Sequence, residues 1–391
     1  MDQTQEEQDI YRGFSCPYQP FNQQFFSLLA AQYSRSLIEV FLDRFEQRLD
    51  ETGNGVTEML SSIHANEPPN DEVFWSAVPG VMMESLTNGD TLSAQRAAAS
   101  LLLHCGAHGV SGDWELRFDQ PSIFLWGPYL LPESERLIVN HKQETVRILS
   151  ELKGSRNESR LHRVAETGAW RSEELTQLPL IADDGYAVTL LPDWAAPPLQ
   201  CGDSPTLSQI SSATHESIAQ ALGLLRALAP RYRDWVTRVL RRLIVVAAPK
   251  SVIKSGNVYG YYSMFYISDC RDPLVIGEML VHEASHQYFH SITPLEDVAD
   301  QTDPTTYYSP FVRRQRTIDR LLLAYHAFGN VYLYYRECLD SKDHHERASA
   351  ELRKVWEDLN VVEETLMTSD KLTPTGRALI EPLYREIHRG N

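Results

Sequence analysis

The sequence predicts an α+β protein dominated by helices, with a small β-containing segment in the middle of the chain. Apolar residues recur at helical spacing through residues 21–49, whereas residues 114–118 alternate between apolar and polar side chains as a strand does. We therefore expect a helical N-terminal lobe at 1–110, a β-rich middle segment at 111–200, and a helical C-terminal lobe at 201–391 that carries a metal-binding motif.

Composition narrows the class of protein. The apolar content of 42% fits a folded chain, and a formal net charge of −17 argues against binding to nucleic acid or to an anionic membrane. The five cysteines are far apart and form no Cys-x-x-Cys pair, which argues against a disulfide framework. Residues 1–10 are polar and lack the pattern of a secretory signal, the cysteines fit reduced cytosolic thiols, and apolar runs such as 243–248 are too short to span a bilayer, so we expect a cytoplasmic protein without membrane spans.

Turn and cap signals divide the chain into individual elements. Pro, Gly and Asn-rich stretches separate the expected helices of the N-terminal lobe, and a Pro-rich stretch places a lobe boundary near residue 200. The helices are expected at 56–64, 71–86, 92–105, 143–152, 208–229, 232–240 and 317–338, and further strands at 123–126, 137–140, 160–166, 178–182, 186–191, 243–247 and 259–267.

The pattern His-Glu-x-x-His at residues 282–286 is the strongest chemical signal in the chain. Asp272 suits an N-cap and Pro273 a first helical position, so this pattern is expected inside a helix. His282 and His286 then lie on one helical face, where two imidazoles can hold one metal ion. Glu283 would lie beside the metal and act as a base or orient a ligand.

Two histidines leave a metal site incomplete, and a third ligand is expected on the next helix. His326 is the first candidate because it interrupts an apolar helical stretch; the alternative is a core histidine bonded to a backbone carbonyl. Glu337 and Glu296 are the carboxylate candidates. His290 is unlikely to reach the same ion, because eight helical residues span about 12 Å.

Arginines are dense between the motif and the next helix. Arg313, Arg314, Arg316 and Arg320 exceed what a peptidase needs near its metal, whereas an oxygenase that uses 2-oxoglutarate needs a cation for the distal carboxylate. The alternative is that they only solvate the start of a helix. In the aromatic strand that precedes the motif, Tyr262 and Tyr266 are candidates for substrate contact, with core packing as the alternative.

Residues 259–331 resemble the HExxH-motif family of 2-oxoglutarate-dependent peptide β-hydroxylases. The resemblance rests on three elements: the Val-His-Glu-x-x-His core, a Tyr-x-Pro-aromatic element followed by an arginine, and an Ala-Phe-x-x-Val segment in a later helix. These elements correspond here to Val281–His286, to Tyr308, Pro310, Phe311 and Arg316, and to Ala327, Phe328 and Val331.

The resemblance implies a non-haem Fe(II) oxygenase that hydroxylates an amino-acid side chain, at its β-carbon, in a peptide or carrier-bound substrate of natural-product biosynthesis. In that interpretation His282, His286 and His326 hold the iron, Arg316, Arg313 and Tyr308 bind 2-oxoglutarate, and Glu283 orients a ligand. The alternatives are a zinc metallopeptidase with Glu283 as general base, and a scaffold in which the histidines only pack.

Overall fold

The computed structural model describes residues 10–66, 73–191, 211–246 and 255–389. Helices make up 51% and strands 22% of the structure, which confirms the predicted α+β, mainly helical class. The chain forms two compact units: unit 1 comprises residues 1–29, 181–257 and 263–391, and unit 2 comprises residues 30–180 and 258–262. No helix in the described ranges combines the length and apolarity needed to cross a membrane.

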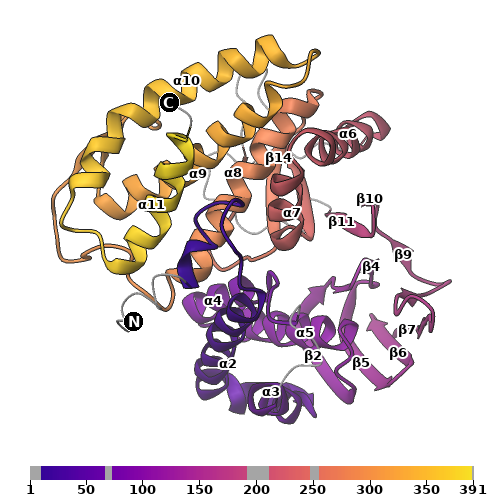
Figure 1. Cartoon of the computed structure of the whole chain (residues 1–391). Coiled ribbons are helices and arrows are strands. Elements are labelled where there is room, and N and C mark those ends of the chain that lie inside the picture. Colours follow the sequence, from indigo (N-terminus) through magenta and orange to yellow (C-terminus); the bar gives the residue numbers. More distant parts are fainter. Residues whose placement is uncertain (1–9, 67–72, 192–210, 247–254, 390–391) are drawn as a thin grey trace. The chain divides into compact units, whose positions relative to one another are not determined.

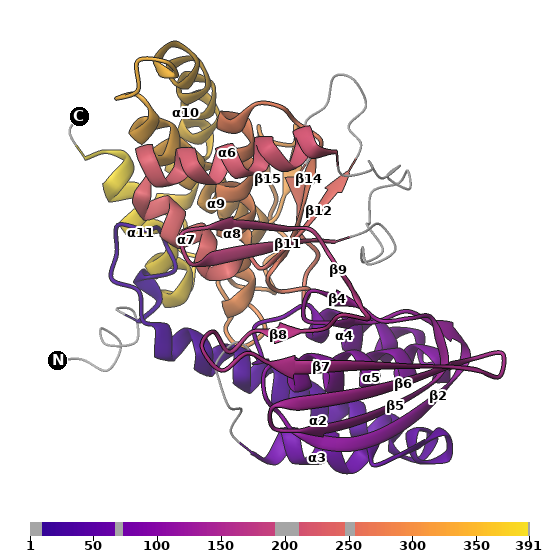
Figure 2. The same ribbon diagram turned by 90° about the vertical axis from the view of Figure 1, so that its right-hand side faces the viewer.

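Unit 2 is an antiparallel sheet with helices packed against one face. Helices α3 and α5 contact strand β2, and Figure 2 shows β2, β5, β6 and β7 side by side in front of them. The helices are α2 (Gln23–Thr52), which starts in unit 1, α3 (Val56–Ala65), α4 (Val78–Asn88) and α5 (Thr91–Ala107). The sheet has the order β1 (Gly53–Asn54), β2 (Gly112–Ser122), β5 (Ser134–Lys142), β6 (Thr145–Leu152), β7 (Ser155–Arg163), β8 (Trp170–Arg171), and a smaller sheet holds β3 (Leu125–Trp126), β4 (Tyr129–Leu130) and β9 (Thr176–Gln177).

The helix predicted at 143–152 is wrong, because this segment is strand β6. Its side chains alternate between exposed and buried, with Val146 and Ile148 in the core, and it pairs with β5 and β7 along its length. The hairpin turns that flank it contain Gln143 and Lys153, both with positive φ. Local composition favoured a helix, but pairing with β5 and β7 and the burial of one face stabilise a strand instead.

Unit 1 contains a second, five-stranded sheet, in the order β10-β11-β12-β14-β13. Strands β11, β12 and β14 are parallel, and β13 is an antiparallel edge strand. The turn at Asp184-Gly185 has positive φ at both residues, as the Asp-Gly signal predicts. The strands are β10 (Leu180–Asp183), β11 (Tyr186–Leu191), β12 (Arg242–Val246), β13 (Ser255–Gly256) and β14 (Met264–Ser268).

Unit 1 contains six further helices in its described residues: α8 packs against β13 and β14, and α9 lies next to α8 (Figure 1). Helices α10 and α11 pack on the other sides of α9. Inside the unit, the ring of Tyr288 stacks on Trp235 with centroids 3.7 Å apart, which fixes α7 against α8. The helices are α6 (Ser212–Leu228), α7 (Pro230–Val239), α8 (Pro273–Ile292), α9 (Ile318–Cys338), α10 (His345–Thr368) and α11 (Pro374–Ile387), and a hairpin of β15 (Tyr307–Ser309) and β16 (Arg314–Arg316) precedes α9.

Three boundaries differ from the expected ones. The units do not divide at residue 110, because α5 and β2 bury their apolar faces against each other and share one core. The helix expected at 71–86 begins only at Val78, with Pro79 in its first turn. The strand expected at 259–267 begins only at Met264, because Gly260 and Ser263 have positive φ and break the extended backbone before it. The boundary expected near residue 200 lies outside the described residues.

Candidate metal centre

Helix α8 carries the His-Glu-x-x-His pattern as predicted. Asp272 caps its N-terminus by accepting hydrogen bonds from the backbone N–H groups of Leu274 and Val275 at 3.0 and 3.4 Å. The rings of His282 and His286 lie next to each other on one face, with centroids 4.6 Å apart and planes at 90°. The helix therefore brings two imidazoles to one place without help from any other element.

The two imidazoles are half-buried, and their surroundings favour the neutral form that binds metals. Burial lowers the pKa of His282 to about 4 and the pKa of His286 well below its ordinary value. The Nδ1 atom of His286 is buried and has no hydrogen-bond partner among the described residues. A buried nitrogen without a partner is costly, and two neighbouring neutral imidazoles can contribute two of the ligands that a metal ion needs.

Glu283 lies in the interior, 1% exposed, and both of its carboxyl oxygens accept a hydrogen bond. The hydroxyl of Ser255 donates to Oε1 at 2.6 Å, and Nδ2 of Asn257 donates to Oε2 at 2.9 Å. Burial raises the pKa of Glu283 to about 8, and these two hydrogen bonds lower it only in part. Oε1 lies 4.0 Å from Nε2 of His282, so the carboxyl group is held beside the imidazole pair.

Sequence reasoning missed Ser255 and Asn257, which hold Glu283 from the edge strand of the sheet. Gly256 stands between them, and a Cβ on Gly256 would lie 2.1 Å from the Tyr266 hydroxyl, so a larger residue there would force the Tyr266 ring to move. Tyr266, predicted to contact substrate, thus packs over the segment that holds Glu283. The one available signal was two polar residues flanking a glycine shortly before an aromatic strand.

His326 lies within electrostatic reach of His286, but it does not form a three-residue metal group with His282 and His286 in the described ranges. His326 is 1% exposed, and its Nε2 donates to the carbonyl oxygen of Phe14 at 2.9 Å. This is the arrangement of the alternative, a core histidine bonded to backbone. The other candidates also lie elsewhere: Glu337 accepts from the Tyr18 hydroxyl, and Glu296 is exposed. Across the described ranges, no three His, Cys, Asp or Glu side chains form a group that could hold a metal.

The side of α9 that faces His282 presents an aromatic ring rather than a ligand. Phe328 contacts the His282 ring with centroids 4.8 Å apart, and Phe311 stacks on Phe328 at 4.3 Å with nearly parallel planes. Both phenylalanines belong to the segments that carry the family resemblance. They form an apolar wall beside the imidazole pair, which limits the access of water to that side.

Arg316, in the arginine-rich hairpin, lies within electrostatic reach of His286. Its positive charge contributes to the lowered pKa of His286. Arg316 is half-buried, and within the described part of the chain its guanidinium has neither a hydrogen bond nor an ion pair. Burial and the charges of Arg314 and Arg320 lower its own pKa, as expected for a cation without an anion. A half-buried arginine with five free donors is a natural site for a carboxylate.

The remaining predicted residues occupy different environments. Arg313 and Tyr308 are exposed on the β15–β16 hairpin, and the exposed fraction of Tyr308 is 51%. Tyr262 belongs to unit 2, where it is buried and stacks on Trp75 with ring centroids 4.7 Å apart. Tyr262 therefore packs in a core, which was the stated alternative to substrate contact.

Comparison with known proteins adds no assignment. The chain matches no protein-family model, and no curated protein matches it significantly.

Proposed function

We propose that this chain is a non-haem Fe(II) and 2-oxoglutarate-dependent oxygenase that hydroxylates an amino-acid side chain, with His282 and His286 as iron ligands. The observation that carries the proposal is the half-buried, unpaired Arg316 within electrostatic reach of the His286 imidazole, which neighbours that of His282. A hydrolytic zinc site does not require such a cation, whereas the distal carboxylate of 2-oxoglutarate needs one.

Each residue of the proposed site then has a definite role. His282 and His286 offer neutral nitrogens to the metal, and Arg316 forms a bidentate pair with the cosubstrate carboxylate, with Arg313 and Tyr308 at the outer rim. Glu283, held by two neutral donors, fixes the orientation of groups at the metal. Bound iron and 2-oxoglutarate would supply the oxygen activation and the electrons needed to insert a hydroxyl group into a C–H bond.

The ligand set of the proposal differs from the predicted one. His326 is left outside it, because its Nε2 is already committed to the Phe14 carbonyl. The substrate class, a side chain of a peptide or of a carrier-bound amino acid in natural-product biosynthesis, and the cytoplasmic setting rest on the family resemblance and on composition. The apolar wall of Phe311 and Phe328 supports the proposal, because oxygenases must keep water away from the metal.

The test is anaerobic loading of the chain with Fe(II), followed by 2-oxoglutarate. We expect the weak visible charge-transfer band of a metal-bound 2-oxo acid. His282→Ala should abolish the band and the bound iron, while Arg316→Gln should keep the iron and raise the 2-oxoglutarate concentration needed for the band. Arg353→Gln, an exposed arginine on α10, serves as the control. Iron that binds without any 2-oxoglutarate response in the unaltered chain would overturn the proposal.

One observation favours a second candidate, a zinc metallopeptidase. Strand β13 is an antiparallel sheet edge that contacts α8, and a peptide substrate can add to such an edge as a further strand. Against this, both oxygens of Glu283 are already engaged, whereas a general base needs one directed at a metal-bound water. Tight zinc, together with peptide hydrolysis that Glu283→Gln abolishes, would establish the peptidase instead.

A further inference from the structure

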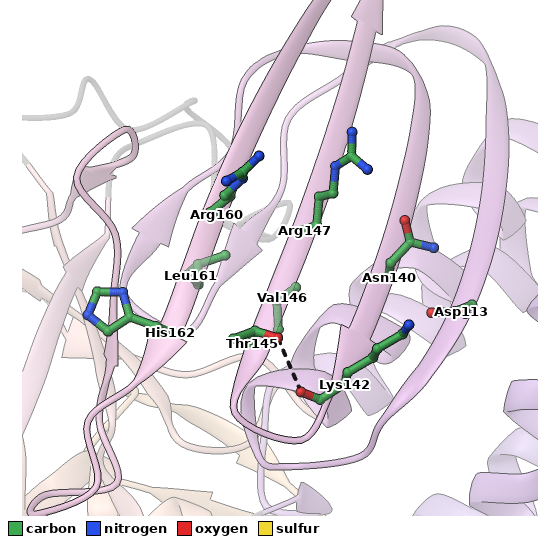
Figure 3. A pocket seen from close by; sticks show the side chains of 9 residues that line it. All are labelled: Asp113, Asn140, Lys142, Thr145, Val146, Arg147, Arg160, Leu161 and His162. Atoms are coloured by element: carbon green, nitrogen blue, oxygen red, sulfur yellow. Dashed lines mark hydrogen bonds between the residues drawn. The ribbon is translucent and has the colours of Figure 1, made fainter.

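The exposed face of the six-stranded sheet in unit 2 contains a hollow of about 560 Å³. Figure 3 shows side chains that line it on neighbouring strands of the sheet. Most of these side chains can donate hydrogen bonds, and the opposite face of the same strands is buried. The lining residues are Asp113, Asn140, Lys142, Thr145, Val146, Arg147, Arg160, Leu161 and His162.

The strand register places these side chains in two rows across the sheet. Asp113 pairs with Asn140, Asn140 with Arg147, and Arg147 with Arg160, so the first row crosses β2, β5, β6 and β7. In Figure 3 the side chains of Arg160, Arg147 and Asn140 follow one another across the strands. The second row runs from Lys142 through Thr145 to His162. Strand spacing makes the first row about 14 Å long.

The hollow is positively charged in a chain whose formal net charge is −17. Its lining holds Lys142, Arg147 and Arg160 against one carboxylate, Asp113. Nearby, Glu158 divides its two oxygens between Arg147 and Arg160, at 2.7 and 2.9 Å, and Glu174 accepts from the backbone N–H of Arg160 at 3.4 Å, so these two arginines already have carboxylates beside them. In the described part of the molecule the Lys142 ammonium has no ion-pair partner. Such a field favours an anionic ligand.

We propose that this hollow binds an extended, acidic segment of a peptide partner, with carboxylates at alternate positions. Arg147 lies one strand over and two residues along from the position opposite Lys142, a diagonal of about 7–8 Å. Side chains at i and i+2 of an extended peptide lie on one face about 6.6 Å apart, so two carboxylates can reach both cations. A single small anion would occupy only one end of a row of this length.

The inference deepens the proposed function, because the partner would be a part of the peptide substrate remote from the residue that reacts. Arg147 and Arg160 stand directly opposite each other on β6 and β7, a like-charge pair that destabilises a sheet unless an anion lies between them. Glu158 provides that anion in the free chain, and a carboxylate of the bound segment would share the same two guanidinium groups.

Binding to the full-length, metal-free chain tests the inference separately from the iron site. The probe is a short fluorescein-labelled peptide with glutamate at alternate positions, followed by fluorescence anisotropy. We expect binding that weakens as salt increases, and we expect Lys142→Ala and Arg147→Ala each to weaken it about tenfold. Lys142→Arg should retain binding. Arg156→Ala, on the same face of β7 but outside the hollow and paired with Glu151, should leave it unchanged.

Several outcomes would overturn the inference. These are equal affinity for a peptide with glutamine in place of glutamate, equal affinity for a single-stranded oligonucleotide of matched charge, or equal losses in Arg156→Ala and Arg147→Ala. Displacement of the peptide by inorganic phosphate at similar concentration would show a simple anion site instead. Since the assay contains no iron, its failure leaves the proposed oxygenase untouched, and failure of the iron experiment leaves the peptide site untouched.

Discussion

Glu283 in unit 1 and Glu158 in unit 2 both accept hydrogen bonds on each carboxyl oxygen, but their surroundings differ. Glu283 is buried among neutral donors, and burial raises its pKa to about 8. Glu158 is partly exposed between Arg147 and Arg160, and the hydrogen bond from Arg147 is the main cause that holds its pKa below the ordinary value. Burial thus favours the neutral form of one carboxyl group, whereas the other stays charged and can exchange partners.

The largest expected effect is on the pH dependence of stability and tests the buried carboxyl group, Glu283. In the metal-free chain Glu283 keeps its proton up to about pH 8, compared with 4.5 for an ordinary glutamate. Its contribution to the free energy of unfolding is therefore full below pH 4.5 and is lost as the pH rises through 8, by up to about 5 kcal/mol. We expect Glu283→Gln to remove this loss when urea unfolding is measured across that range. An unchanged pH dependence would show that Glu283 is ionised in the native state.

A smaller effect of opposite sign is expected for His326. Burial lowers its pKa from 6.5 to about 4, so its contribution to stability is present above pH 6.5 and is lost as the pH falls through 4. The shift corresponds to about 3 kcal/mol. His326→Gln retains a donor for the Phe14 carbonyl and should unfold with a shallower acid dependence, followed by circular dichroism. If His326 instead binds iron, the variant will lose metal, which atomic absorption detects.

The next prediction concerns the Glu283 clamp, the two hydrogen bonds that Ser255 and Asn257 donate to the Glu283 carboxyl group. Asn257→Ala leaves Oε2 of a buried carboxyl group without its donor and should lower the free energy of unfolding by about 1–3 kcal/mol. Ser255→Thr retains a hydroxyl group for Oε1 and is the matched control, with a much smaller expected change. Equal urea midpoints for Asn257→Ala and the unaltered chain would contradict the clamp.

The smallest effect is expected on the exposed sheet. Arg136 donates to Glu115 and Glu151 at 2.7 and 3.1 Å, with 25% of its side chain exposed. We expect Arg136→Gln to cost about 1 kcal/mol in denaturant unfolding at low salt, and less at high salt because ions screen exposed pairs. A loss comparable to that of the Glu283 clamp would erase the distinction between the two environments.

Sequence reasoning succeeded where the signal is local. The cap at Asp272, the proline at position 273 and the spacing of His282 and His286 all lie within one helix, and helix α8 has them as expected. The Asp184-Gly185 turn is also local, since its backbone conformation depends on the two residues themselves. Such features can be predicted because few alternatives compete with them.

Sequence reasoning failed where residues distant in the sequence determine the local structure or the hydrogen-bond partner. Strand β6 is a strand because β5 and β7 pair with it, and His326 points to Phe14, more than three hundred residues away in the sequence. Ser255 and Asn257 look like ordinary polar residues until the sheet edge meets α8. No periodicity or composition in a single sequence encodes these long-range contacts.

The segment around Ser15 has a consequence for biosynthesis. The Ser15 hydroxyl donates to the Leu379 carbonyl and accepts from the Leu383 backbone N–H, while Asn330 donates to the Ser15 carbonyl. Unit 1 is therefore completed only after α11 has left the ribosome. The last strand of the six-stranded sheet, in contrast, ends at Arg171 and is translated much earlier. The sheet of unit 2 can therefore form first during translation, whereas the segment around Ser15 finds its partners only after α11 has been made. Contacts between residues so far apart in the sequence slow folding.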